Sequence, residues 1–176
     1  MGKFVLGLVL GFVAVPALVY LYLASGRAPA SATDPPMPLE RKIASTALHA
    51  KMEKEMPRTV PLEANEATYL AGARVYRANC AVCHGLPGQP PPAIAKGMFP
   101  SCPQLWTKDG MVTDDPPGET FWKVKNGIRL TGMPGFGRAL STDEMWQVSL
   151  LLANADKLPP TVPTALAASS GPGEPK

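Results

Sequence analysis

Cysteine and histidine are concentrated in one short stretch of this chain, NCAVCHGLPG, which runs from Asn79 to Gly88. It contains Cys80, Cys83 and His84, which are two of the chain's three cysteines and one of its two histidines. A C-x-x-C pair followed directly by histidine fits three chemistries: a zinc site, a dithiol redox pair, or covalent attachment of haem. Each chemistry requires different surroundings, so the flanking sequence can be used to choose among them.

The surroundings argue against the first two chemistries. A structural zinc site needs four ligands, commonly as two separated pairs, and the remaining candidates, Cys102 and His49, form no second pair. A thioredoxin-like pair should follow a strand, whereas the residues before Cys80 form an alanine-rich helical pattern. In covalent haem attachment each thiol bonds to one vinyl group, and the histidine binds the iron. The motif therefore predicts haem bound through Cys80 and Cys83, with His84 as an axial ligand.

A second axial ligand is expected farther along the chain, because the haem iron of an electron carrier usually has both axial positions filled. Methionine is the commonest partner for histidine in this role. Met133 lies in NGIRLTGMPGFG, a glycine-rich loop stiffened by Pro134, and such a loop can pass close over a flat ring. The alternatives to Met133 are Met98, Met111, His49 and an open sixth position.

The pairing of CAVCHG with a downstream GMPGFG resembles the single-haem class I cytochromes c, over about residues 66–158. The resemblance implies an all-α fold, with three to five helices around one covalently attached haem c. It also implies that Cys80 and Cys83 hold the haem, that His84 is the proximal ligand and that Met133 is the distal one.

Four residues outside these two motifs have a less specific signal. Trp106 and Trp122 are candidate hydrogen-bond donors to a haem propionate, and Arg129 is a candidate ion-pair partner. Core packing of the tryptophans and a solvated arginine are the alternative interpretations. Cys102 is expected to be a small, partly buried residue, with an intermolecular disulfide as the alternative, and we assign it no chemistry.

Helical patterns account for the rest of this domain. Residues 66–79 place Gly72 on one face with two tyrosines and an alanine, so a second helix can approach closely there. The second helix should begin after Ser141, which forms a capping-box pattern with Glu144, and a short helix is expected at 118–126. No stretch alternates as a strand should, so the domain is predicted to be all-α.

The N-terminal region predicts a membrane anchor. Residues 4–24 form an uncharged apolar run of about twenty residues, the length that crosses a bilayer as one helix. A cleavable secretory signal is the alternative, because Lys3 precedes the run and A-x-A patterns follow it at 28–32. The run is longer than a usual signal core, which favours the anchor. Gly7 and Gly11 form a G-x-x-x-G, a weak indication of a partner helix.

The sequence thus divides into segments of different composition, with one folded domain. In order, they are an N-terminal cap (1–3), the transmembrane anchor (4–24), a Pro/Ala/Ser linker (25–38), an amphipathic helix (39–56), the haem c domain (57–160) and a disordered tail (161–176).

We expect an electron carrier and not an enzyme, since we identify no nucleotide loop and no acid/base pair. The formal net charge is only +3 and there is no basic cluster, so nucleic acid is not an expected partner. Cytochromes of this family receive their haem outside the bacterial inner membrane, which implies a domain tethered in the periplasm that exchanges electrons with a protein donor and acceptor. The alternatives are a haem-carrying subunit of a larger respiratory or dehydrogenase complex, and a haem-based ligand sensor or peroxidase-like enzyme.

Overall fold

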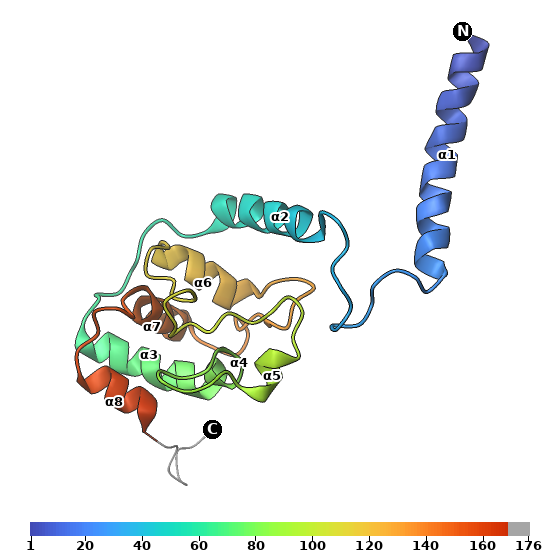
Figure 1. Cartoon of the computed structure of the whole chain (residues 1–176). Coiled ribbons are helices and arrows are strands. Elements are labelled where there is room, and N and C mark those ends of the chain that lie inside the picture. The colour runs from blue at the N-terminus through green and yellow to red at the C-terminus, as the bar shows by residue number, and fades with distance from the viewer. Residues whose placement is uncertain (169–176) are drawn as a thin grey trace. The chain divides into compact units, whose positions relative to one another are not determined.

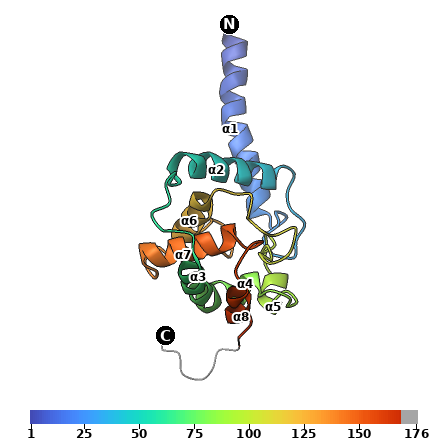
Figure 2. The same ribbon diagram turned by 90° about the vertical axis from the view of Figure 1, so that its left-hand side faces the viewer.

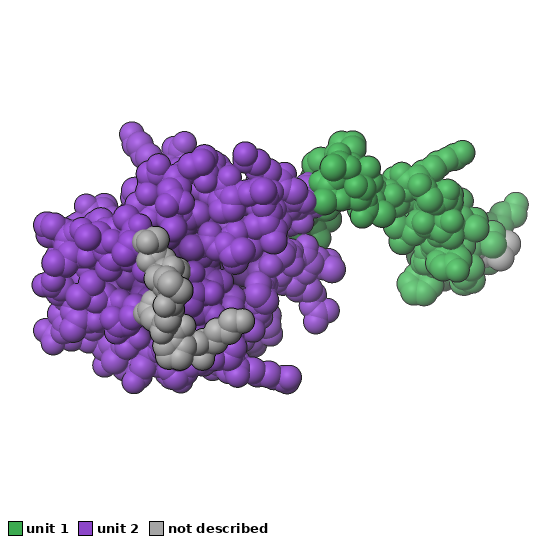
Figure 3. All heavy atoms as spheres, turned by 90° about the horizontal axis from the view of Figure 1, so that it is seen from below, with its two compact units in different colours: residues 1–44 green, residues 45–176 purple. Residues whose placement is uncertain are grey.

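The computed structural model describes residues 1–168, and these contain helices and no strands. Figure 1 labels these helices and colours them by residue number. The prediction of an all-α chain is therefore confirmed. The chain divides into two compact units, residues 1–44 and 45–176, which Figure 3 shows in different colours.

The first unit contains α1 (Gly2–Ala24), which covers the predicted anchor. This helix is long and apolar enough to cross a membrane, and none of its most apolar window is buried inside the protein. The backbone is open at Gly7 and Gly11, where an added Cβ would meet nothing within 4 Å. A contact between this G-x-x-x-G and a partner helix stays a prediction.

Helix α2 (Glu40–Glu55) lies within the segment 39–56, for which an amphipathic helix was expected, and most of it belongs to the second unit. Within that unit it packs on α6 (Pro117–Asn126) through a small apolar cluster. Met52 and Met56 are buried there with Trp122. The chain leaving α2 stays close to α6, because a Cβ on Gly118 would overlap the carbonyl oxygen of Pro57.

The core of the second unit forms where α3 (Glu66–Asn79) packs on α7 (Thr142–Ala153). Both helices are visible near the centre of Figure 2, with α6 beside α7. Asn65 caps α3 by accepting a hydrogen bond from the backbone N–H of Thr68 at 3.0 Å. The predicted capping box of α7 is present, with Ser141 and Glu144 bonded reciprocally. These caps satisfy backbone groups that a helix start would otherwise leave unpaired.

One expectation about the C-terminal region is wrong. The segment from Thr161 was expected to be disordered, but it forms α8 (Thr161–Ala167), which packs against α3. Val162 and Leu166 lie one helical turn apart and both are 0% exposed. Two apolar residues are too short a stripe to recognise in sequence, yet they are sufficient once α3 offers a surface. The rest of the expected tail, 169–176, lies outside the described residues.

Candidate functional site

The C-x-x-C-H motif forms a single helical turn at the end of α3. Cys80 ends α3 and is also the N-cap of α4 (Ala81–His84). Its carbonyl oxygen accepts hydrogen bonds from the backbone N–H groups of Cys83 at 3.1 Å and of His84 at 2.9 Å. This turn presents all three side chains from one compact piece of backbone. All three are partly buried, and the cysteines form no disulfide.

Burial keeps the side chains of Cys80 and Cys102 in the thiol form. It raises the pKa of Cys80 to about 12, and the neighbouring Cys83 contributes to the rise. Burial also raises the pKa of Cys102. At neutral pH both are therefore uncharged, which suits a site with little contact with water.

The imidazole of His84 is held by a backbone acceptor. Its Nδ1 lies 2.8 Å from the carbonyl oxygen of Pro103. A carbonyl oxygen can only accept, so Nδ1 carries the proton and donates it. Burial lowers the pKa of His84, and the bond to Pro103 opposes this only in part, so the ring is neutral at pH 7. Its Nε2 therefore has a free lone pair, as a metal-binding histidine requires.

The loop that carries Met133 is closed by its own backbone bonds. The carbonyl oxygen of Met133 accepts a hydrogen bond from the backbone N–H of Ile128 at 3.1 Å. The backbone N–H of Met133 donates to Oγ1 of Thr131 at 3.1 Å. Gly127 begins the loop at a φ of +67°, a conformation that favours glycine. The Met133 side chain is partly buried and packs against the main core.

The alternative ligands lie in different places. Met98 is next to this loop, because a Cβ on Gly132 would overlap the methyl group of Met98. The structure therefore brings Met98 close to the backbone that carries Met133. Met111 is partly buried in the loop before α6, and His49 is exposed on α2.

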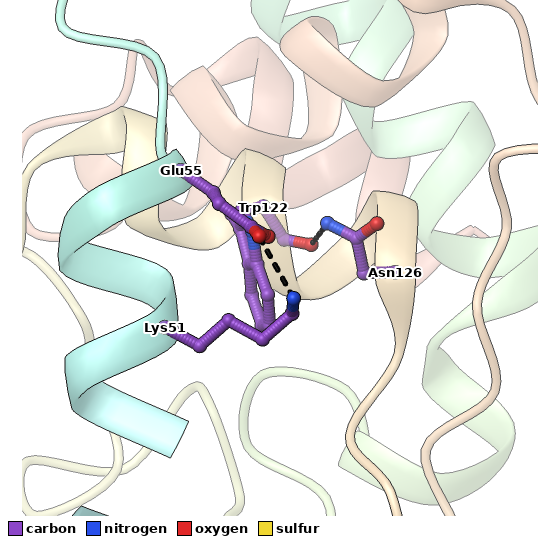
Figure 4. Close-up of polar contacts among 4 residues, drawn as sticks. All are labelled: Lys51, Glu55, Trp122 and Asn126. Atoms are coloured by element: carbon purple, nitrogen blue, oxygen red, sulfur yellow. Dashed lines mark hydrogen bonds and ion pairs between the residues drawn. The ribbon is translucent and has the colours of Figure 1, made fainter. Parts of the chain in front are cut away.

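The three candidate propionate partners also differ. Trp106 packs edge-on against Tyr76, with ring centroids 5.4 Å apart, and its buried Nε1 has no hydrogen-bond partner among the described residues. The Nε1–H of Trp122 instead donates to the carboxylate of Glu55 at 3.1 Å (Figure 4). A propionate contact of Trp122 would require that bond to break. Arg129 is exposed on the Met133 loop.

The donor set fits haem well. Two partly buried cysteines and a neutral histidine lie on one turn, and a thioether lies on a separate glycine-rich loop. The unpaired indole N–H of Trp106 also supports a bound haem. A buried donor without an acceptor costs free energy unless a further group accepts its hydrogen bond. A haem propionate is such an acceptor.

Sequence reasoning missed two residues of this arrangement. Pro103 provides the acceptor for His84, and Gln104 donates through Nε2 to the carbonyl oxygens of Cys83 and Cys102, each at 3.2 Å. Pro103 lies 19 positions after His84 and is one of 21 prolines, so no local signal marks it. The contacts of Pro103 and Gln104 form only because the loop that contains them folds back against α4.

Comparison with known proteins agrees with this arrangement. Residues 67–150 match the family described as Cytochrome C oxidase, cbb3-type, subunit III. No curated protein and no solved structure matches the chain. The matched stretch begins in α3, ends in α7 and includes both the C-x-x-C-H turn and the Met133 loop. The described part of the chain is all-helical with an apolar N-terminal helix, and residues 67–150 form a cytochrome c domain.

Proposed function

We propose that this protein transfers single electrons through one haem c, held covalently by Cys80 and Cys83 and ligated by His84 and Met133. The cytochrome c domain gives haem-based electron transfer as the general activity. When bound, the haem iron supplies the Fe(III)/Fe(II) couple. The number of haems, their attachment and the two ligands are the specific parts of the proposal.

The hydrogen bond from His84 Nδ1 to the carbonyl oxygen of Pro103 carries the assignment of the proximal ligand. It selects the tautomer with a free Nε2 and fixes the plane of the ring. A histidine with a freely rotating ring would not be held by a backbone acceptor at 2.8 Å. His84 is therefore prepared to bind iron before any ligand arrives, which reduces the ordering needed on binding.

Met133 is preferred over Met98 as the distal ligand because of the loop backbone. Bonds from Ile128 and Thr131 hold both peptide groups of Met133, so its side chain starts from a defined position. The Met98 side chain is instead packed against Gly132. Trp106 would hold one propionate through its unpaired indole N–H.

We also propose that α1 tethers the protein to the bacterial inner membrane, with the haem domain in the periplasm. The length and composition of α1 support the anchor, and the family resemblance supports the side of the membrane. Residues 25–38 are proposed as the linker, and the haem domain is proposed to extend through α8. An anchored domain would meet its donor and acceptor at the membrane surface.

The matched family favours a second candidate function. That family is described as a subunit of a cbb3-type oxidase. This chain is then a haem-carrying subunit of a larger respiratory complex, with α1 as a membrane contact. Purification in mild detergent distinguishes the two functions, because a fixed subunit isolates with partner chains in constant ratio and a free carrier isolates alone.

Counting thiols tests the covalent attachment. In the denatured full-length protein, a thiol reagent should titrate one of the three cysteines, Cys102, because Cys80 and Cys83 are thioethers. The haem should stay with the polypeptide in acidified acetone, and Cys102→Ala should leave no titratable thiol. Three reactive thiols together with extractable haem would contradict the proposal.

A further inference from the structure

Cys102, to which the sequence assigned no chemistry, lies beside the proximal histidine. Its Sγ is 3.4 Å from Nδ1 of His84 and 3.4 Å from the carbonyl oxygen of Cys83. It directly precedes Pro103, whose carbonyl oxygen lies 2.8 Å from the same Nδ1. The one cysteine outside the C-x-x-C pair is thus in contact with two of the motif's three residues.

The protons determine what this thiol can do. Nδ1 of His84 has one hydrogen and donates it toward the carbonyl of Pro103, so it has no lone pair to accept from the thiol. The S–H of Cys102 therefore donates to a carbonyl oxygen, and that of Cys83 at 3.4 Å is nearer than that of Pro103 at 3.8 Å. The sulfur lone pairs then face the Nδ1–H group as a second, weaker acceptor.

The position of the thiol is set by the surrounding chain. Gln104 donates from Nε2 to the carbonyl oxygens of Cys83 and Cys102, each at 3.2 Å, and so ties this segment to the end of α4. The other end of the same amide lies against Gly85, where an added Cβ would be 2.7 Å from Oε1. The thiol is partly buried, and its segment is tied to the Cys83 carbonyl that it faces.

We propose that Cys102 is a positioning residue for the proximal ligand. Its thiol bridges the carbonyl of Cys83 and the Nδ1–H of His84, which restricts rotation of the imidazole and makes the ring a stronger electron donor. A stronger donor favours the ferric state, so Cys102 lowers the reduction potential. This inference rests on the proposed function, in which Nε2 of His84 binds the iron.

The test compares three variants of the full-length haem protein. In Cys102→Ala both contacts are lost, and the midpoint potential should rise and the g values of the ferric electron paramagnetic resonance spectrum should change. Cys102→Ser keeps a donor and an acceptor on a shorter side chain, so its potential should lie between those of Cys102→Ala and the wild type. Ser101→Ala changes the exposed neighbouring residue and should leave both readouts unchanged.

Two results would overturn the inference. One is a Cys102→Ala protein with the potential and g values of the wild type; the other is a Ser101→Ala protein with the same shifts as Cys102→Ala. If Cys102→Ala does not yield haem protein, the test uses Cys102→Ser instead. A wild-type midpoint potential and wild-type g values in Cys102→Ser would then contradict the inference. Failure of the proposed function would be seen separately, because the wild-type protein would then lack the low-spin signal of histidine and methionine ligation.

Discussion

Gly72 of α3 lies directly against the backbone carbonyl of Gln147 in α7, and a Cβ at this position would overlap that carbonyl. Because the obstacle is backbone, the two helices would have to move apart to accept a side chain. The neighbouring residues Tyr69, Ala73 and Tyr76 are all buried on the same face of α3. The close crossing of α3 and α7 therefore depends on a residue with no side chain.

Gly72→Ala should destabilise the protein by about 1–3 kcal/mol, the usual cost of overpacking a core. Alanine is favoured over glycine inside a helix by about 1 kcal/mol, so a net loss can be attributed to the overlap. The free energy of unfolding from urea denaturation measures the change. Gly97→Ala is the matched control, because a Cβ there meets only the carbonyl of Ile94 at 3.8 Å. Equal losses in both variants would show that the helix crossing is not the cause.

The parts of this fold that could be predicted from sequence are those with local signals. The face of α3 around Gly72 follows from spacing within one helix, and α3 begins and ends where its pattern indicated. The capping box of Ser141 and Glu144 joins residues three positions apart, so it is readable before any tertiary structure is known.

The parts that sequence could not provide join residues far apart in the chain. The bond of His84 to Pro103, and the position of Cys102 beside it, exist only because the loop after α5 (Ala93–Lys96) returns to α4. The burial of Leu166 likewise depends on a surface of α3. No periodicity or motif encodes these contacts, since each depends on packing between separate segments.

The burial of Leu166 in α8 leads to a prediction that separates the folded segment from the disorder expected from sequence. Leu166 is 0% exposed, so Leu166→Ala should lower the free energy of unfolding by about 2–5 kcal/mol, as for other buried leucines. Ala167→Ser alters the next, exposed residue of the same helix and should have little effect. Wild-type stability in Leu166→Ala would mean that α8 does not pack on α3 in solution.

Two methionine substitutions test the distal ligand. The ferric wild-type protein should show the weak far-red charge-transfer band that reports methionine sulfur on the iron. Met133→Ala should abolish this band. Met98→Ala should keep it, because the Met98 side chain packs against Gly132 and the proposed sulfur ligand is Met133. Loss of the band in Met98→Ala and its survival in Met133→Ala would reverse the assignment.

Carbon monoxide provides the complementary test of a filled sixth position. The reduced wild-type protein should not bind carbon monoxide at neutral pH, whereas reduced Met133→Ala should bind it, because removing the thioether opens the site. Binding by the wild type would contradict a closed iron. It would favour the ligand sensor or peroxidase-like enzyme over the electron carrier.

The contact between Glu55 and Trp122 predicts how the packing of α2 on α6 depends on pH. The Glu55 carboxylate accepts hydrogen bonds from Lys51 at 2.8 Å and from the Trp122 indole at 3.1 Å (Figure 4). Both bonds lower the pKa of Glu55, and the bond from Lys51 has the larger effect. A carboxyl whose pKa is lowered by folding stabilises the protein above its unfolded pKa. That stabilisation is lost as the pH falls through the folded pKa.

Glu55→Gln should therefore reduce the free energy of unfolding at pH 7, and the difference from the wild type should shrink as the pH falls below 4.5, the ordinary pKa of a glutamate side chain. Urea denaturation across this pH range measures both proteins. Trp122→Phe removes the indole donor, so the effect of Glu55→Gln at pH 7 should be smaller in that background. Added salt should weaken the effect, because the carboxylate is exposed. A difference between Glu55→Gln and the wild type that stays constant from pH 7 to below 4.5 would show that the charge of Glu55 does not hold α2 on α6.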